Sequence, residues 1–271
     1  MDNGHEAYKE MNISILIPSH SLSIFTKMTV ATLKREVRNH NMQIHIGYHS
    51  NLFEYTSDFS MFSDLQNHCY FHAVDEIDWV EDRTNTYRYS KMHAKNLENL
   101  FKNVRYFDFD YLAILDNDLY IKSNFVDQLI GKFPDSDVIG NYFNDITQEL
   151  NTKDHFGNDV IFAPKLSIWN LIISRKLFDM IINNTSIIYP NFYDGVFYDT
   201  LARVLYEVNS NEQFKKGIIT TEEMSNMIDH FFFFFFNYSR DMNSCGLNGE
   251  LPFKIWESVF GNNYKKYIDS I

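Results

Sequence analysis

The sequence predicts an α/β fold with a mixed, mainly parallel, Rossmann-like sheet flanked by helices. Two apolar stretches of strand length, 12–20 and 43–49, are separated by a helical pattern, which is the order of a βαβ unit. A third apolar run, 111–115, is short and continuous, as expected for a strand buried on both faces. We find no internal repeat and no Gly/Ser/Pro-rich linker, so we expect one domain over residues 1–271.

The composition is that of a folded, acidic protein. Of 271 residues, 45% are hydrophobic and 22% are charged, so the chain can bury a normal core. The net charge of −12 argues against a protein that coats nucleic acid, which needs a basic face. It does not exclude a phosphate-bearing substrate, because one divalent ion and a local Arg or Lys can reverse the sign inside a cleft.

Cysteine usage and hydropathy lead us to expect a cytoplasmic protein. The two cysteines, Cys69 and Cys245, suggest neither a disulfide framework nor a Cys-based zinc site, which fits a reducing compartment. Residues 1–10 are polar and acidic, so we expect no signal peptide. The longest oily stretch, 231–236, is far shorter than the ~20 apolar residues of a membrane span, so we expect no transmembrane segment.

The N-terminal elements follow from the spacing of apolar residues. The strand at 12–20 stops at Pro18, which cannot donate to a strand ladder. Residues 21–40 have helical character, and the alternation at 43–49 predicts the second strand. Two further elements are expected before the third apolar run: a short strand at 69–74 and a long helix over 83–105.

The remainder predicts shorter elements around two irregular stretches. Residues 141–164 are polar and irregular, and so long a loop suggests a lid or an acceptor-side function. Residues 191–209 begin as a loop and continue as a helix. Other elements are expected in five places: helices at 124–133 and 174–183, strands at 137–140 and 214–219, and an apolar segment at 166–173.

The triplet Asp116-Asn117-Asp118 follows directly after the apolar run at 111–115. Two carboxylates at the end of a buried strand are costly unless something positive lies between them. Residues i and i+2 project to the same side of a strand end, so Asp116 and Asp118 can converge on one hard cation such as Mg²⁺ or Mn²⁺. The alternative is a loop whose acidic residues face water.

Four segments, in the same order along the chain, resemble GT-A glycosyltransferases of the family 2 type. They are the opening strand at 14–18, the DxD-like triplet at 116–118, the segment at 169–178 that follows the acceptor loop, and the segment at 198–203, which is similar to the ED-x-x-x-x-R segment of inverting members. The resemblance covers about 13–230. It implies a GT-A fold with a nucleotide-binding half at 12–120, an acceptor-binding half at 121–236 and a tail at 237–271.

Three departures from the family pattern leave the subfamily open. The first acid of the ED pair is replaced, since the chain reads Tyr198-Asp199. The family often has an acidic residue after the second strand, where this chain reads His49-Ser50-Asn51. The Gly-rich acceptor turn of many members is replaced by residues 167–170.

The resemblance implies a nucleoside-diphosphate sugar as donor and Mn²⁺ or Mg²⁺ as cofactor. The acceptor would be a carbohydrate, a lipid-linked molecule or a protein. Donor contacts would come from the triplet, through Asp116 and Asn117, and from the end of the first strand, through Pro18, Ser19 and His20.

The same resemblance implies a set of metal ligands. Asp118 would bind the ion directly, and Asp116 would contact the ribose or reach the ion through water. His230 is the candidate third ligand, because GT-A members often supply a late His or Asp, and Asp229 could serve instead. The alternative for His230 is a histidine at a strand edge whose hydrogen bonds are made to backbone.

Asp199 is the candidate catalytic base that takes the proton of the acceptor hydroxyl. Its alternative role is to cap the helix that follows, since Asp is favoured at such positions. Asp194 is the second candidate base, and its alternative is an ordinary Asp-Gly turn.

Three other functions remain open. A retaining GT-A enzyme would share Asp116 and Asp118 but need no base at Asp199. A nucleotidyltransferase that makes sugar nucleotides usually has a Gly-rich basic loop after the first strand, whereas residues 18–23 contain neither Gly nor Arg. A catalytically inactive sugar-nucleotide-binding module is compatible with the missing acid before Asp199.

Overall fold

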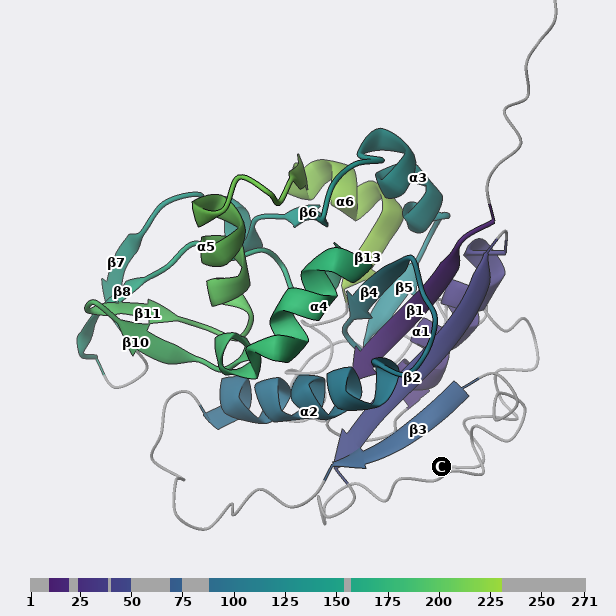
Figure 1. The fold of residues 1–271 in the computed structure, drawn as a ribbon, viewed down its shortest axis with the longest axis horizontal. Coiled ribbons are helices and arrows are strands. Elements are labelled where there is room, and N and C mark those ends of the chain that lie inside the picture. Colours follow the sequence, from purple (N-terminus) through teal and green to yellow (C-terminus); the bar gives the residue numbers. More distant parts are fainter. Residues whose placement is uncertain are drawn as a thin grey trace, which may run out of the picture.

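A seven-stranded sheet forms the centre of the protein (Figure 1). The computed structural model describes residues 10–19, 24–38, 40–49, 69–74, 88–153 and 157–230. From one edge to the other the strands are β12 (Lys216–Ile219), β6 (Val138–Asn141), β9 (Asn170–Ser174), β4 (Tyr111–Leu115), β1 (Asn12–Pro18), β2 (Asn41–His49) and β3 (Cys69–Val74). Every neighbouring pair is parallel except the two that involve β9. The predicted mixed, mainly parallel sheet is therefore confirmed.

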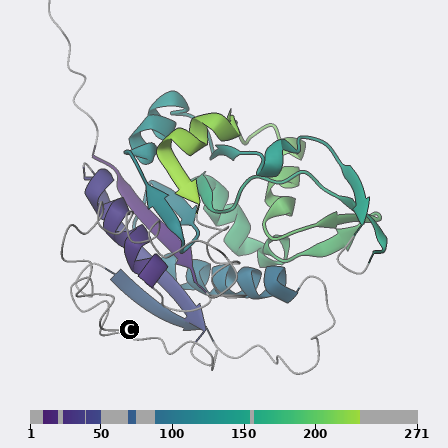
Figure 2. The ribbon, with the colours of Figure 1, turned by 180° about the vertical axis from the view of Figure 1, so that it is seen from behind.

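Helices cover both faces of this sheet (Figures 1 and 2). One core cluster joins it to α1 (Ile24–Glu36), α3 (Phe125–Lys132) and α6 (Thr221–Met227); the other joins it to α2 (Arg88–Val104), α4 (Arg175–Asn183) and α5 (Ala202–Ser210). Strand β1 contributes to both, because Ile15 and Ile17 point into the first cluster and Leu16 into the second. No helix in the described part of the chain has the length and apolarity to cross a membrane.

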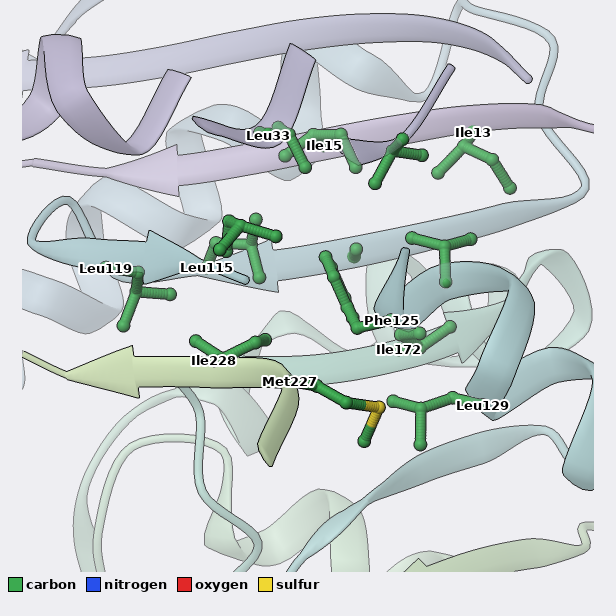
Figure 3. Packing of buried hydrophobic residues seen from close by; sticks show 14 of the residues in the cluster. Ile13, Ile15, Leu33, Leu115, Leu119, Phe125, Leu129, Ile172, Met227 and Ile228 are labelled. Carbon is green, nitrogen blue, oxygen red and sulfur yellow. The ribbon is translucent and has the colours of Figure 1, made fainter. Parts of the chain in front are cut away.

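The acidic triplet is anchored by buried leucines on both sides. Leu115 ends β4 and Leu119 begins β5 (Leu119–Ile121), and both are fully buried in the first cluster. Figure 3 shows Leu119 close to Ile228. Truncating a fully buried leucine to alanine costs roughly 2–5 kcal/mol, so the core fixes where this turn lies.

Strand β5 lies outside the main sheet, and its hydrogen-bond partners are strand β13 (Ile228–His230) and two threonines of α1. It pairs with β13 in an antiparallel ladder. On α1, the Thr29 hydroxyl oxygen accepts from Leu119 N at 2.8 Å, and Thr32 accepts from Ile121 N at 3.2 Å. Two helix threonines thus replace a strand partner and hold the segment after the triplet against α1.

The two stretches expected to be irregular contain short strands. Residues 141–164 include a 3₁₀ turn (Phe143–Asp145), β7 (Leu150–Lys153) and β8 (Asp159–Phe162), and 191–209 begins with the hairpin β10 (Asn191–Tyr193) and β11 (Val196–Tyr198). These strands form a second sheet, in the order β10-β11-β8-β7. All four residues of β7 are exposed, so its sequence lacks the apolar alternation that predicts a strand.

Helix α6 was also absent from the sequence prediction, although its signal is present. Thr220 is its N-cap, and the Thr220 and Glu223 side chains form a reciprocal capping box with the backbone of its first turn. The other expected helices and strands are present, with ends shifted by a few residues, in the part of the chain that the structure describes.

A histidine pair is buried between β2 and β3. His45 is fully buried, and its Nδ1 lies 3.1 Å from Nε2 of His72. Its ring stacks on Tyr70 at a centroid distance of 4.9 Å and meets Phe107 edge-on at 4.7 Å. Burial, together with the neighbouring His72, lowers the pKa of His45 to about 3, and burial lowers the pKa of His72. Both rings are therefore neutral at neutral pH.

We predict that acid weakens the fold through this pair. Both folded-state pKa values lie below the unfolded value of 6.5, so the unfolded chain binds more protons as the pH falls from there. Stability present at neutral pH should then be lost by up to about 1.4 kcal/mol per pH unit for each histidine.

Urea unfolding at several pH values measures this loss. His45→Phe keeps an aromatic ring in the stack but cannot take up a proton, so its stability should depend less on pH between neutrality and about pH 4. The same pH slope in both proteins would show that His45 is not responsible.

Candidate functional site

The acidic triplet lies where the order of strands in the sheet reverses. From β1 the chain adds β2 and β3 on one side, and β4 then pairs with the opposite side of β1. In open α/β sheets, ligands bind outside the carboxyl ends of the strands at this switch point. Strand β1 ends at Pro18 and β4 at Leu115, so Ser19 and the triplet occupy the place where such a sheet offers a site.

Hydrogen bonds join the triplet to the end of β1. Asn117 Nδ2 donates to Ser19 Oγ at 2.9 Å, with a longer contact of 3.4 Å to Thr26 Oγ1. The Ser19 N–H donates to Gly47 O at 2.8 Å, at the end of β2. The expected donor-binding residues Pro18, Ser19 and Asn117 therefore lie together, while His20 falls outside the described residues.

The carboxylates beside Asn117 differ in exposure. Asp118 is buried, with 8% of its surface exposed, and Asp116 is half-buried. Oxygen ligands from carboxylates at a strand end suit Mg²⁺ or Mn²⁺, so the chemistry of these two residues fits the expected ion. Among the described residues, however, no three His, Cys, Asp or Glu side chains come together as a ligand cluster.

Strand β13 brings the backbone of the expected third ligand to the triplet. In the antiparallel pair, His230 lies opposite Leu119 and Asp229 lies opposite Tyr120. The late segment of the chain thus runs beside the residue that follows Asp118. The side chains of His230 and Asp229 fall outside the described residues.

Helix α2 presents a polar face to the same edge of the sheet. Ser90, His93 and Asn96 are spaced by three, so they share one side of the helix. Asn96 Nδ2 donates to Ser19 O at 2.7 Å and to Gly47 O at 3.2 Å. These residues were not predicted from the sequence, although polar residues at every third position of a helix indicate one polar side.

His93 links the two halves of the candidate site electrostatically. Burial lowers its pKa, the negative charges of Asp116 and Asp199 act in the opposite direction, and the charge of Lys165 adds to the lowering. The three charged groups named here therefore lie within electrostatic range of one imidazole. Asp116 and Asp199, the residue predicted from the sequence to be the catalytic base, thus act on the same imidazole.

Asp199 forms an ion pair instead of capping a helix. Its Oδ2 accepts from Lys165 Nζ, and its Oδ1 accepts from Thr200 N at 2.8 Å. The N-cap of α5 is Leu201, in the left-handed region at φ 59°, and it makes no side-chain capping bond. The alternative role expected for Asp199, that of a helix cap, is therefore not the one it has.

The Asp199 carboxyl is held in its ionised form. Burial raises its pKa, but the charge of Lys165 and the hydrogen bonds from Lys165, Ser90 and Thr200 outweigh burial, so the pKa is lowered overall. Thr200 Oγ1 also donates to Ser90 O at 2.8 Å. These bonds fasten the start of the α5 segment to α2.

Asp194 lies at the tip of the hairpin between β10 and β11. It is exposed, and the pair Asp194-Gly195 adopts φ values of 48° and 82°, as a two-residue hairpin turn requires. This is the turn role that the sequence offered as an alternative. Asp194 is not among the side chains found at the switch point.

A second polar group missed by the sequence analysis lies next to the triplet. Asn170 pairs with Leu115 in the sheet, and its Nδ2 donates to Asn141 Oδ1 at 2.9 Å. Asn141 Nδ2 in turn donates to Thr221 Oγ1 at 3.1 Å. The buried Asn170 Oδ1 and Ser167 Oγ have no hydrogen-bond partner within the described structure, which is unusual for buried polar atoms.

No protein-family model and no curated protein matches this chain. Solved structures with a similar chain path include 4-diphosphocytidyl-2C-methyl-D-erythritol synthase from Anaerococcus prevotii, at 10% identity and a TM-score of 0.47, over 78% of this chain and 89% of that one. A mannosyltransferase from Pyrobaculum calidifontis in complex with GDP-Man and Mn²⁺ matches at 8% identity and 0.46, over 79% and 56%. Glucosyl-3-phosphoglycerate synthase of M. tuberculosis matches at 11% and 0.43, over 78% and 71%.

All three TM-scores lie below 0.5. At such identities and TM-scores the likeness identifies no family and no activity for this chain.

The contact between Gly47 and Asn96 provides a test of how the site is held together. A Cβ at Gly47 would lie 1.8 Å from Asn96 Oδ1, so Gly47→Ala must displace the Asn96 side chain or α2. We expect a loss of roughly 1–3 kcal/mol in unfolding free energy, measured by chemical denaturation, because the amide also loses its two carbonyl partners.

Gly131→Ala is the matched control for this substitution. Its added Cβ meets no atom of the described residues within 4 Å, and alanine in place of a helical glycine should raise stability by up to about 1 kcal/mol. If both substitutions changed stability equally, the close approach at Gly47 would have no structural importance.

Proposed function

We propose that this protein is a metal-dependent glycosyltransferase that moves a sugar from a nucleoside-diphosphate sugar to an acceptor hydroxyl. The observation that carries the proposal is the position of Asp116-Asn117-Asp118 at the switch point between β1 and β4, tied to Ser19 by Asn117. An acidic triplet at this place suits a diphosphate that arrives with a divalent ion, because the carboxylates repel the diphosphate unless a cation lies between them.

In this proposal Asp118 and Asp116 hold Mn²⁺ or Mg²⁺, with His230 as the third protein ligand. The pairing of β13 with β5 supports that choice, since it sets the backbone of His230 opposite Leu119. When bound, the ion supplies Lewis-acid stabilisation of the negative charge that develops on the departing diphosphate. Ser19, Asn117 and the end of β1 bind the nucleotide part of the donor and orient it along the edge of the sheet.

Asp199 is the proposed acceptor-side base. Its ionised state is the one that a proton acceptor needs, and its electrostatic relation to His93 and Asp116 supports a position near the reacting groups. An inverting reaction would use this carboxylate directly. A retaining enzyme would need no base there, and the acceptor itself can be a carbohydrate, a lipid-linked molecule or a protein.

A single assay separates the competing functions. The protein is incubated with Mn²⁺ and a panel of nucleotide sugars, and release of nucleoside diphosphate is followed, first without acceptor and then with simple sugars. Diphosphate release supports the glycosyltransferase. Pyrophosphate release from a nucleoside triphosphate and a sugar phosphate would indicate a nucleotidyltransferase instead, and tight nucleotide binding without turnover over hours would indicate a binding module.

We predict that Asp118→Asn removes Mn²⁺-dependent nucleotide binding while the fold survives. The substitution neutralises a carboxylate proposed to bind the ion, so calorimetry should show at least a tenfold weaker affinity for nucleoside diphosphate in the presence of Mn²⁺. Asp179→Asn on α4 is the control, because its carboxylate is exposed and pairs with Arg175 at 3.0 Å. Unchanged affinity in Asp118→Asn would remove the metal role.

We predict that Asp199→Asn lowers kcat with little change in nucleotide affinity. The amide cannot accept a proton, so turnover should fall by roughly 10²-fold or more if Asp199 is the base. Steady-state kinetics with the best donor of the panel, with calorimetry for nucleotide binding, measures both quantities. Full activity of the variant would reduce Asp199 to a structural partner of Lys165.

A further inference from the structure

A largely buried ion pair joins two segments that sequence reasoning did not connect. Lys165 and Asp199 lie 34 residues apart in the chain, and only 15% and 20% of their side chains are exposed. Lys165 belongs to the connection between β8 and β9, and Asp199 follows β11. Removing one partner of such a buried pair strongly destabilises the protein, because the other charge is left uncompensated.

Both partners are held in place by further contacts. Lys165 Nζ lies 4.5 Å from the centroid of the Phe143 ring, and Phe143 N donates to Lys165 O at 3.0 Å. Asp199 is fixed by Thr200 and by the Ser90 hydroxyl of α2. These contacts give the Lys165 ammonium group a defined position without a bound substrate.

Lys165 supplies the positive charge that opposes the effect of burial on the Asp199 carboxylate. The groups that face it are Lys165 from the β8–β9 connection, Ser90 and His93 from α2 and Thr200 from its own segment, with Asp116 acting on the same imidazole from the end of β4. Of these, Lys165 carries the compensating positive charge. Burial opposes the ionisation of a carboxylate at this position.

We propose that Lys165 is a positioning residue for Asp199: it keeps the carboxylate ionised and fixes its direction, so that the carboxylate is ready to accept the proton of the acceptor hydroxyl. This inference rests on the proposed function. Lys165 itself exchanges no proton and touches no reacting atom. Its removal should let Asp199 take up a proton in the buried site, and activity should then return when the pH is raised.

The kinetic test compares the pH dependence of kcat/KM in the native protein, Lys165→Met and Lys165→Arg. In Lys165→Met we expect the acidic limb of the profile to move up by about one pH unit or more, with at least a tenfold larger loss of activity at about pH 6 than at about pH 8. Lys165→Arg keeps the charge and should keep the native profile. A loss that is uniform with pH would overturn the proposal and leave Lys165 a structural residue.

Lys132→Met is the control for the removal of a lysine charge. Lys132 pairs with Glu223 at the surface, where nearly half of each side chain is exposed, so its profile should match that of the native protein. A shift in this variant as large as that in Lys165→Met would show a general effect of net charge and would also overturn the proposal.

A second readout does not require any activity. Thermal unfolding is measured against pH for Lys165→Met and for Lys165→Met/Asp199→Asn. The single variant buries an unpaired carboxylate, so its Tm should fall relative to the double variant as the pH rises from about 5 to about 8. A difference in Tm that is constant with pH would overturn the inference. If this difference appears but no donor is turned over by the native protein, the proposed function fails while the role of Lys165 in setting the charge of Asp199 stands.

Discussion

The side chain of Asn96 holds together the ends of the parallel strands β1 and β2, beside the candidate site. Its amide nitrogen donates to the carbonyl groups of Ser19 and Gly47, and Gly47 O also accepts from the Ser19 N–H. Its own Oδ1 is buried without a hydrogen-bond partner among the described residues, at a cost of about 1–3 kcal/mol. Glycine at position 47 leaves the space that this amide occupies, since a Cβ there would lie 1.8 Å from Asn96 Oδ1.

The rest of the site follows from the position of α2. Once Asn96 fixes the helix against the ends of β1 and β2, the residues one and two turns earlier, His93 and Ser90, must lie over the same edge of the sheet. Ser90 then meets the segment of Asp199 and Thr200, which comes from the opposite half of the chain. One helix thus joins the expected nucleotide-binding half to the expected acceptor-binding half, and their relative position is set by its packing.

The main sheet could be predicted because its strands are continuous apolar runs with clear ends. Strand β4 and the triplet could be predicted from local sequence alone, because the apolar run of the strand ends at Leu115 and the acidic triplet begins at the next residue, Asp116. The placement of the triplet at the switch point was not predicted, because it depends on β4 pairing with the side of β1 opposite to β2. The short strands β7, β8, β10 and β11 could not be found in this way, because they are three or four residues long and are stabilised by partners distant in sequence.

The same limit applies to the residues of the site. The triplet at 116–118 can be recognised from the sequence because its residues are consecutive. The pairing of Lys165 with Asp199 cannot, because it depends on how two distant connections meet in space. For Asp194 the sequence offered two roles, a candidate base and a turn. An Asp-Gly pair carries a strong local signal for a turn, and the structure uses it as one, with both residues at positive φ.

The charge state of Asp199 has a consequence for the proposed reaction. A base with a lowered pKa is a weak proton acceptor, and it can take a proton only from a hydroxyl that has itself become acidic. In sugar transfer this happens when the acceptor oxygen has begun to bond to an electron-poor anomeric carbon, after departure of the leaving group is well advanced. A carboxylate held ionised by Lys165 therefore suits a reaction in which stabilisation of the leaving diphosphate does most to lower the barrier. That places the larger demand on Asp116 and Asp118, so the triplet and Asp199 would have different tasks.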